Sequence, residues 1–249
     1  MNRIALVTGA SSGFGAAIAR RLVAAGDTVI GTGRRAERLD ALAAELGSAF
    51  RPLVFDLTDR AATDRAVARF DAEPVDVLVN NAGLALGIGK AWEASVDQWE
   101  TMIATNCAAL ARVTRAVVPA MVRRGSGHVV DIGSIAADTA YPGGNVYGAT
   151  KAFVRQFTAN LRADLHGTGV RATVIEIAAA ETEFSVVRFS GDAARAKAVY
   201  QGFTPLSADD VAAAVTWALD QPRHVNVARI DLWPTAQAPG GPVYHRTAT

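Results

Sequence analysis

Thr8-Gly9-Ala10-Ser11-Ser12-Gly13-Phe14-Gly15 separates a short apolar run, Ile4-Ala5-Leu6-Val7, from a helical period that begins at Ala16. A buried strand that turns through glycines into a helix is typical of the first half of a βαβ unit. The glycines permit a tight turn and a close approach of the backbone to a pyrophosphate, whose charge the helix N-terminus stabilises. The pattern predicts a dinucleotide-binding turn, and a plain strand-to-helix turn is the alternative interpretation.

The remaining pattern alternates short β-branched runs with longer amphipathic segments, which indicates βαβ units around a parallel sheet. Seven strands are predicted, at Ile4–Thr8, Thr28–Thr32, Phe50–Phe55, Val75–Val79, His128–Ile132, Val170–Glu176 and Arg229–Leu232. Helices are predicted at Ala16–Ala25, Ala36–Leu46, Ala61–Phe70 and around Trp99–Val122, with capping signals at Ser95 with Gln98 and at Ser207 with Asp210. We expect one doubly wound α/β domain of the Rossmann type, with a seven-stranded parallel sheet, over residues 1–249.

Composition narrows the function. The chain has 249 residues, is 50% hydrophobic, and carries 25 Lys and Arg against 24 Asp and Glu. Such a balance favours neither nucleic acid nor a membrane surface as partner and leaves a small-molecule substrate. A single cysteine, Cys107, fits a reducing cytoplasm. The four histidines have no metal-ligand spacing, so no metal site is expected.

The end of the second strand indicates which dinucleotide is bound. An acid there would accept hydrogen bonds from a ribose 2′-hydroxyl, but the chain reads Gly31-Thr32-Gly33-Arg34-Arg35. Two guanidinium groups are suited to a 2′-phosphate, so we predict NADP as the coenzyme. Alternatively, Arg34 alone recognises the phosphate while Arg35 and Arg38 lie on an exposed helix.

The chemistry is indicated by Tyr147-Gly148-Ala149-Thr150-Lys151, in which helical spacing brings the phenol and the ammonium onto one face. A nearby ammonium, together with a cationic nicotinamide, favours phenolate and lowers a tyrosine pKa that is ordinarily near 10. Tyr147 could then exchange a proton with a carbonyl or an alcohol oxygen, and Ser134, after the fifth strand, could hold that oxygen. Taken alone, such a Tyr–Lys pair is an ordinary helix surface contact.

Together these motifs resemble the short-chain dehydrogenase/reductase family. The resemblance rests on the G-x-x-x-G-x-G spacing, Asn80-Asn81-Ala82-Gly83 after the fourth strand, Asp56-Leu57 after the third, and Asn106. It implies a catalytic tetrad of Asn106, Ser134, Tyr147 and Lys151, with Asn106 holding a water of the proton relay. It also implies a homotetramer and a coenzyme site made of Gly9, Ser11, Ser12, Gly13, Phe14, Gly15, Arg34, Arg35, Asp56, Leu57, Asn81, Ala82, Gly83, Tyr147, Lys151 and Thr182.

Longer stretches, including Gly143–Phe157, Asn80–Gly87 and Thr182–Ser185, are similar to the bacterial NADP-dependent 3-hydroxy acid dehydrogenases. That similarity implies a small hydroxy acid of the L-allo-threonine or serine type, bound by Ser134 and Tyr147. Its carboxylate needs a cation, for which Arg188 is the candidate, and a solvated arginine is the alternative. Thr182–Phe203 mixes aromatic and basic residues, and we expect residues 182–205 to form a substrate lid, or else an ordinary surface helix pair.

One departure concerns the loop after the sixth strand. The family generally has Pro-Gly there, whereas this chain has Ile177 and Ala178. Proline fixes φ and glycine adopts conformations closed to alanine, so the loop is expected to differ. Two other functions therefore remain open: a carbonyl reductase for a bulkier ketone or aldehyde, and a non-catalytic NADPH-binding protein.

Overall fold

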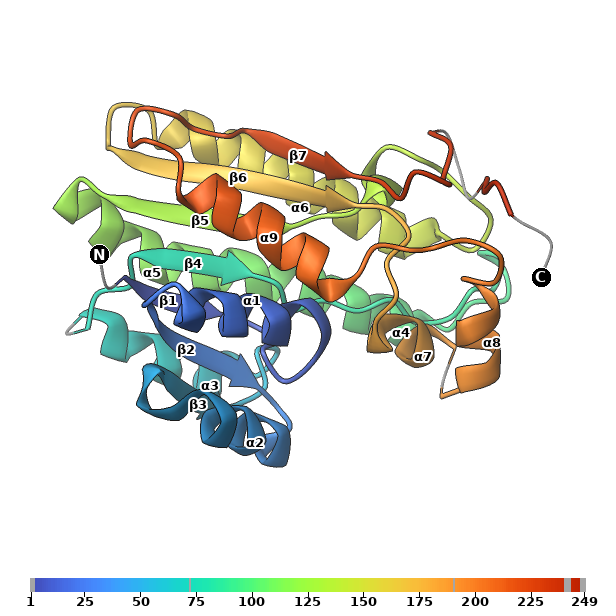
Figure 1. The fold of residues 1–249 in the computed structure, drawn as a ribbon, viewed down its shortest axis with the longest axis horizontal. Helices are drawn as coiled ribbons and strands as arrows, with labels where there is room; N and C mark the ends of the chain where they lie inside the picture. Colours follow the sequence, from blue (N-terminus) through green and yellow to red (C-terminus); the bar gives the residue numbers. More distant parts are fainter. Residues whose placement is uncertain (1–2, 72, 190, 240–242, 247–249) are drawn as a thin grey trace.

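A computed structural model describes residues 3–71, 73–189, 191–239 and 243–246. Its seven strands form one parallel sheet in the order β3-β2-β1-β4-β5-β6-β7 (Figure 1). The strands are β1 (Ile4–Val7), β2 (Thr28–Gly33), β3 (Phe50–Val54), β4 (Val77–Asn80), β5 (Gly127–Ile132), β6 (Val170–Ile177) and β7 (Arg229–Leu232). The predicted single doubly wound domain and its seven strands are confirmed.

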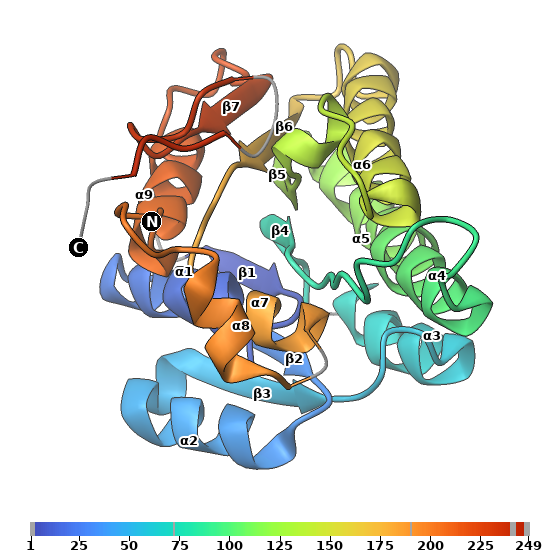
Figure 2. The ribbon, with the colours of Figure 1, turned by 90° about the vertical axis from the view of Figure 1, so that its right-hand side faces the viewer.

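Helices cover both faces of the sheet, which is why the central strands are mostly apolar. They are α1 (Gly13–Ala24), α2 (Ala36–Leu46), α3 (Arg60–Ala68), α4 (Val96–Ile103), α5 (Leu110–Arg124), α6 (Asn145–Asp164), α7 (Glu183–Arg188), α8 (Ala193–Ala198) and α9 (Ala208–Leu219). One core packs α1, α2 and α9 against the sheet, and a second packs α5 against the opposite face. Figure 2 shows the sheet between these layers.

Strands β1 to β3 are added toward one edge of the sheet, and β4 to β7 are added toward the other edge, starting again beside β1. The order of the strands therefore reverses between β1 and β4. In open α/β sheets, ligands bind outside the carboxyl ends of the strands at such a switch point. The Gly-rich turn after β1 and the Asn-rich turn after β4 both lie there. The topology therefore places the motifs of the sequence analysis at one edge of the sheet.

Local signals account for two helix starts. The Ser207 hydroxyl accepts a hydrogen bond from the backbone N–H of Asp210, whose carboxylate accepts one from the backbone N–H of Ser207, so this capping box is confirmed. Ser95 Oγ accepts from the backbone N–H of Gln98 at 3.4 Å, at the start of α4. These caps satisfy backbone donors that the first helical turn leaves unpaired.

The long helix predicted around Trp99–Val122 is interrupted by a π-helical segment, Ala104–Ala109, which joins α4 to α5. An extra residue in a helical turn rotates the following side chains, and such turns are frequent at functional sites. This one contains Asn106, whose side chain is buried.

At the positions where the family generally has Pro-Gly, this chain continues strand β6. β6 continues through Ile177, which pairs with Leu232 of β7, and the backbone N–H of Ala178 donates to the Leu232 carbonyl at 3.0 Å. The Ile177 side chain is 4% exposed and belongs to the first core. An isoleucine, which has a strong strand propensity, thus continues β6 at the position where the family generally has proline.

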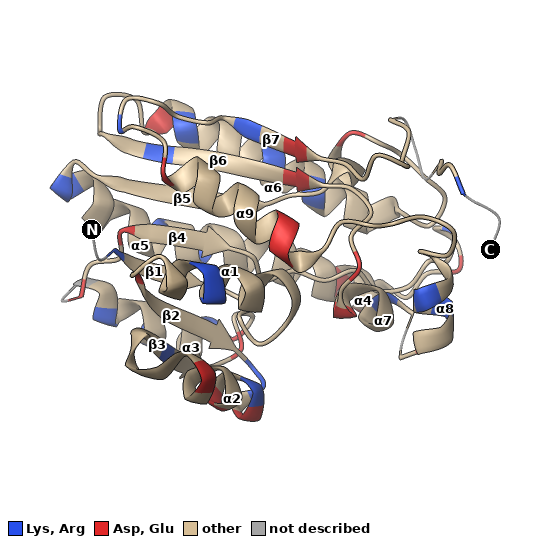
Figure 3. Ribbon diagram, in the orientation of Figure 1, with Lys and Arg blue, Asp and Glu red and all other residues tan. Residues whose placement is uncertain are grey.

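Acidic and basic residues are interspersed over the ribbon (Figure 3), as expected from a nearly neutral chain. Among the described residues, no helix is both long and apolar enough to span a membrane.

Candidate functional site

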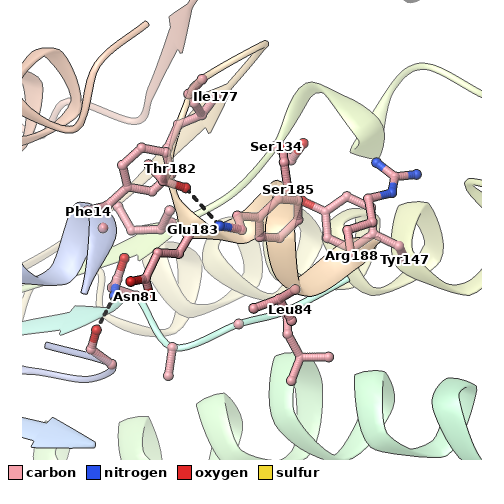
Figure 4. Close-up of a pocket in the computed structure, with 18 of the residues that line it drawn as sticks. Phe14, Asn81, Leu84, Ser134, Tyr147, Ile177, Thr182, Glu183, Ser185 and Arg188 are labelled. Atoms are coloured by element: carbon pink, nitrogen blue, oxygen red, sulfur yellow. Dashed lines mark hydrogen bonds between the residues drawn. The ribbon is translucent and has the colours of Figure 1, made fainter. Parts of the chain in front are cut away.

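A cavity of about 480 Å³ opens at the carboxyl edge of the sheet. It is lined by every residue predicted to bind coenzyme or substrate except Gly15, and by the whole predicted tetrad except Asn106. In Figure 4, Phe14, Asn81, Thr182 and Glu183 lie on one side, and Ser134, Tyr147 and Arg188 lie on the other. The cavity is therefore long enough to join the two predicted halves of the site.

The Gly-rich turn is built for close backbone packing. Gly9 has φ +69° and Gly13 has φ +52°, conformations that favour glycine. Gly15 is glycine for a different reason, because a Cβ there would overlap the Gly9 carbonyl and lie 2.5 Å from Asn81 Nδ2. The missing side chain at Gly15 thus lets the turn pack against itself and Asn81, whereas Gly9 and Gly13 line the cavity.

Hydrogen bonds fasten the turn after β4 to the end of β1. The Thr8 hydroxyl accepts from the backbone N–H groups of Asn81 and Ala82, both at 3.0 Å. The Asn81 side chain donates to the Thr8 carbonyl at 2.8 Å. Two cavity-lining loops from distant parts of the chain therefore hold a fixed relative position.

The two arginines after β2 have different surroundings. Arg34 is 68% exposed, and its guanidinium lies 3.7 Å from the Asp56 carboxylate. Arg35 is tied down, donating to Ser11 Oγ at 3.1 Å, to Ser12 Oγ at 2.6 Å and to the Glu183 carboxylate at 3.0 Å. Arg34 is thus the guanidinium with the greater freedom to meet a ligand.

Tyr147 and Lys151 are buried together in the cavity wall. Lys151 Nζ donates to the Ile132 carbonyl at 2.8 Å and lies 5.9 Å from the centroid of the Tyr147 ring. Burial lowers the pKa of Lys151 to about 8. Burial also favours the neutral form of Tyr147 and so raises the pKa of the phenol. This effect outweighs a hydrogen bond from Ser134 and the charge of Arg188, which both lower that pKa. Lys151 alone therefore does not give the acidic phenol that the helical spacing suggests.

Asn106 is held by the backbone of Leu84. Its amide nitrogen donates to the Leu84 carbonyl, its amide oxygen accepts from the Leu84 N–H, and both distances are 2.9 Å. The same nitrogen donates to Thr150 Oγ1 at 3.0 Å, next to Lys151 on α6. The asparagine thus couples the turn after β4 to the helix that carries the Tyr–Lys pair.

Arg188, the candidate cation for the substrate carboxylate, lies beside the Tyr147 ring. Its Nη2 donates to the Tyr141 hydroxyl at 3.2 Å, and its guanidinium carbon lies 5.8 Å from the Tyr147 ring centroid. Within the described part of the chain, its buried Nε has no hydrogen-bond partner. A buried guanidinium N–H without an acceptor is suited to an anionic ligand.

Sequence reasoning missed several groups at or behind the cavity. Gln237 and Tyr244, near the C-terminal end, line it, and Gln237 Oε1 accepts from the backbone N–H of Ala179 at 2.8 Å. Behind it, the Asp131 carboxylate accepts from Asn80 at 2.8 Å and Thr158 at 2.7 Å, and burial raises the Asp131 pKa to about 6. These contacts join segments far apart in sequence, for which no short motif gives a signal.

Glu176 is the least expected of these groups. Its side chain, on β6, is 0% exposed, and neither carboxylate oxygen has a hydrogen-bond partner among the described residues. Burial raises its pKa to about 7, against opposing effects of Arg229 and Arg155. An unpaired buried carboxyl is costly once it ionises.

The family model of short chain dehydrogenases matches residues 3–192. Serine 3-dehydrogenase from Agrobacterium fabrum is 49% identical over 243 residues, covering 97% of each chain. NADP-dependent 3-hydroxy acid dehydrogenase YdfG from Escherichia coli K12 is 51% identical over 246 residues, covering 98% of this chain and 99% of the relative. The solved closed form of serine dehydrogenase complexed with NADP+ has a TM-score of 0.93 and 51% identity, covering 98% of this chain and 100% of the other.

Replacing Gly15 with alanine tests the packing of the Gly-rich turn. The added methyl group would collide with the Gly9 carbonyl and with Asn81, so we expect a loss of about 1–3 kcal/mol in the free energy of unfolding. Denaturant titration measures that loss. Gly89→Ala is the control, because its Cβ would meet only ordinary contacts at 3.7 Å or more. Equal stability of the two variants would contradict the packing argument.

Glu176→Gln tests the buried carboxyl. A folded-state pKa raised to about 7 means that wild-type stability falls as pH rises from about 4.5 through 7, whereas glutamine cannot ionise. We expect the stability of Glu176→Gln relative to wild type to increase by about 2–3 kcal/mol between pH 5 and pH 8. Unfolding curves at both pH values measure it, and a pH-independent difference would show that Glu176 is ionised at pH 5.

Proposed function

The chain belongs to the short-chain dehydrogenase family, and from that premise we propose that it is an NADP-dependent oxidoreductase acting on the hydroxyl group of a small 3-hydroxy acid. The substrate class is that of serine or L-allo-threonine, and the product is the corresponding carbonyl compound. The observation that carries the proposal is one cavity that joins the Gly-rich turn to Ser134, Tyr147, Lys151 and Arg188. The names of the relatives, NADP-dependent 3-hydroxy acid dehydrogenase and serine 3-dehydrogenase, support it.

We assign the coenzyme to the half of the cavity between the Gly-rich turn and the turn after β4. The side-chain-free cradle at Gly9 and Gly13 fits a pyrophosphate at the N-terminus of α1, and Arg34 is free to meet a 2′-phosphate. Asp56 and Leu57 would contact the adenine, and Thr182 the nicotinamide amide. When bound, NADP(H) supplies the hydride acceptor or donor.

We assign proton handling to Tyr147, with Ser134 holding the substrate oxygen beside it. Because burial raises the Tyr147 pKa, a phenolate requires additional positive charge near the ring. Lys151, whose pKa is about 8, is still largely protonated at neutral pH and contributes some of that charge. Asn106 would position the water that carries the proton onward.

Arg188 distinguishes the small acid from the bulkier ketone. Its partnerless Nε supports an anionic substrate group, which a neutral ketone lacks. A non-catalytic role was suggested by the missing Pro-Gly, but the extended β6 leaves Tyr147, Lys151 and Ser134 on the cavity wall. Both observations favour the hydroxy acid dehydrogenase.

Three further expectations belong to this proposal. Residues 182–205, which include α7 and α8, would act as the lid, because Thr182 and Arg188 both line the cavity. We also propose a homotetramer, in keeping with the family, and Phe153 on α6 is 40% exposed as an interface residue would be in an isolated chain. The cytoplasm is the proposed compartment.

Tyr147→Phe tests the catalytic assignment. Removing the hydroxyl removes the group that accepts the proton of the substrate alcohol, so we expect kcat/KM for serine with NADP+ to fall by about 10²–10⁴-fold. NADPH binding, followed by fluorescence titration, should be retained within a small factor. Unimpaired turnover in the variant would contradict the assignment, as would a wild-type protein that binds NADPH but turns over no hydroxy acid.

Arg188→Ala tests recognition of the carboxylate. Loss of a charge-assisted hydrogen bond should raise KM for a 3-hydroxy acid by about 10–100-fold. A neutral alcohol of similar size is the matched control, since its KM should change little. If KM rose equally for the acid and for the alcohol, Arg188 would be shaping the cavity and not binding the anion.

A further inference from the structure

Glu183, the first residue of α7, makes two ion pairs with the start of α2. One carboxylate oxygen accepts from Arg35 at 3.0 Å and the other from Arg38 at 2.5 Å. We call Glu183, Arg35 and Arg38 the clasp. The pairs join residues 145 and 148 positions apart in the chain, from the segment after β6 to the helix after β2.

The clasp lies beside the coenzyme half of the cavity, next to the Gly-rich turn. Glu183 and Arg35 line that cavity, whereas Arg38 does not. Arg35 also donates to Ser11 and Ser12 of the Gly-rich turn, so three segments are tied together. Thr182 approaches the same turn, because a Cβ built on Gly13 would lie 3.5 Å from the Thr182 Cβ. A dinucleotide lying along the Gly-rich turn would therefore be covered by this contact.

The clasp residues are distinct from the proposed 2′-phosphate site. Arg35 donates hydrogen bonds to Ser11, Ser12 and Glu183, whereas Arg34 is 68% exposed and lies 3.7 Å from the Asp56 carboxylate. Hydrogen bonding from Arg38 and Arg35 lowers the pKa of Glu183, so its carboxylate stays ionised around neutral pH. One carboxylate between two guanidinium groups leaves a net positive charge, which an anionic coenzyme tolerates.

We propose that Glu183, with Arg35 and Arg38, is a positioning residue that retains the bound coenzyme by fastening the start of α7 over the Gly-rich turn. The inference rests on the proposed function, because it requires a dinucleotide in this cleft. It assigns Arg34 to the choice between NADP and NAD, and Arg35 to retention of either. The clasp must open each time a coenzyme leaves.

Stopped-flow displacement of bound NADPH and of bound NADH measures the two dissociation rates. Glu183→Gln should release both coenzymes about fivefold faster, which corresponds to about 1 kcal/mol, as expected for two half-exposed ion pairs. Arg34→Ser should instead accelerate the release of NADPH alone. The two variants thus separate retention from coenzyme choice.

A double-mutant cycle identifies the pair responsible. Arg38→Gln should accelerate release of both coenzymes, and Glu183→Gln with Arg38→Gln should release them no faster than Glu183→Gln alone. Glu37→Gln, which removes an exposed carboxylate from the same turn of α2, is the matched control and should leave both rates unchanged. Thermal unfolding of each variant confirms that it is folded.

Three outcomes would overturn the clasp. Unchanged rates in Glu183→Gln would exclude it, as would additive effects of Glu183→Gln and Arg38→Gln. Slower release of NADPH alone would show that Glu183 competes with the 2′-phosphate. A wild-type protein that binds neither dinucleotide would instead overturn the proposed function itself, so the two failures are distinguishable.

Discussion

Two proton-carrying side chains are buried side by side in the cavity wall, and burial drives both toward their neutral forms. It lowers the pKa of Lys151 to about 8 and raises that of Tyr147. Buried polar side chains need hydrogen-bond partners, because a buried polar group without a hydrogen bond is costly. Lys151 has the Ile132 carbonyl of β5, and Thr150 beside it has Asn106. Tyr147 is therefore neutral in the coenzyme-free site, and an added positive charge near its ring would favour the phenolate.

Close contacts between backbone segments hold the loops around this site in fixed positions. Gly15 and Gly9 touch at the first turn, and Asn81 and Thr8 fix the turn after β4 against the end of β1. The π-helical segment turns Asn106 onto the Leu84 backbone. These contacts lie at the switch point of the sheet, where the strand order produces a crevice. The segment after β6 then crosses to α2 through Glu183.

Local pattern predicted the strands well, because buried parallel strands are short apolar runs bounded by turns. The Gly-rich turn and the Tyr147–Lys151 pair could also be recognised, since their spacing follows from turn and helix geometry, whereas Asn106 and Ser134 were predicted from the resemblance to the family. The different surroundings of Arg34 and Arg35 could not be predicted, because they depend on Glu183, which lies 148 residues from Arg35. For the same reason Gln237, Asp131 and Glu176 gave no signal. At Ile177 the absence of proline predicted a different loop, but only the pairing with Leu232 reveals a longer strand.

Tyr147 can accept a proton only if positive charge beside its ring favours the phenolate. Ultraviolet difference titration of the wild-type protein against Tyr147→Phe, with NADP+ bound and then with NADPH bound, isolates the ionisation of this one phenol. We predict that the phenol ionises at a distinctly lower pH beside the cationic nicotinamide of NADP+ than beside NADPH. Ionisation at the same pH in both complexes would show that the charge of the coenzyme does not lower the pKa of Tyr147.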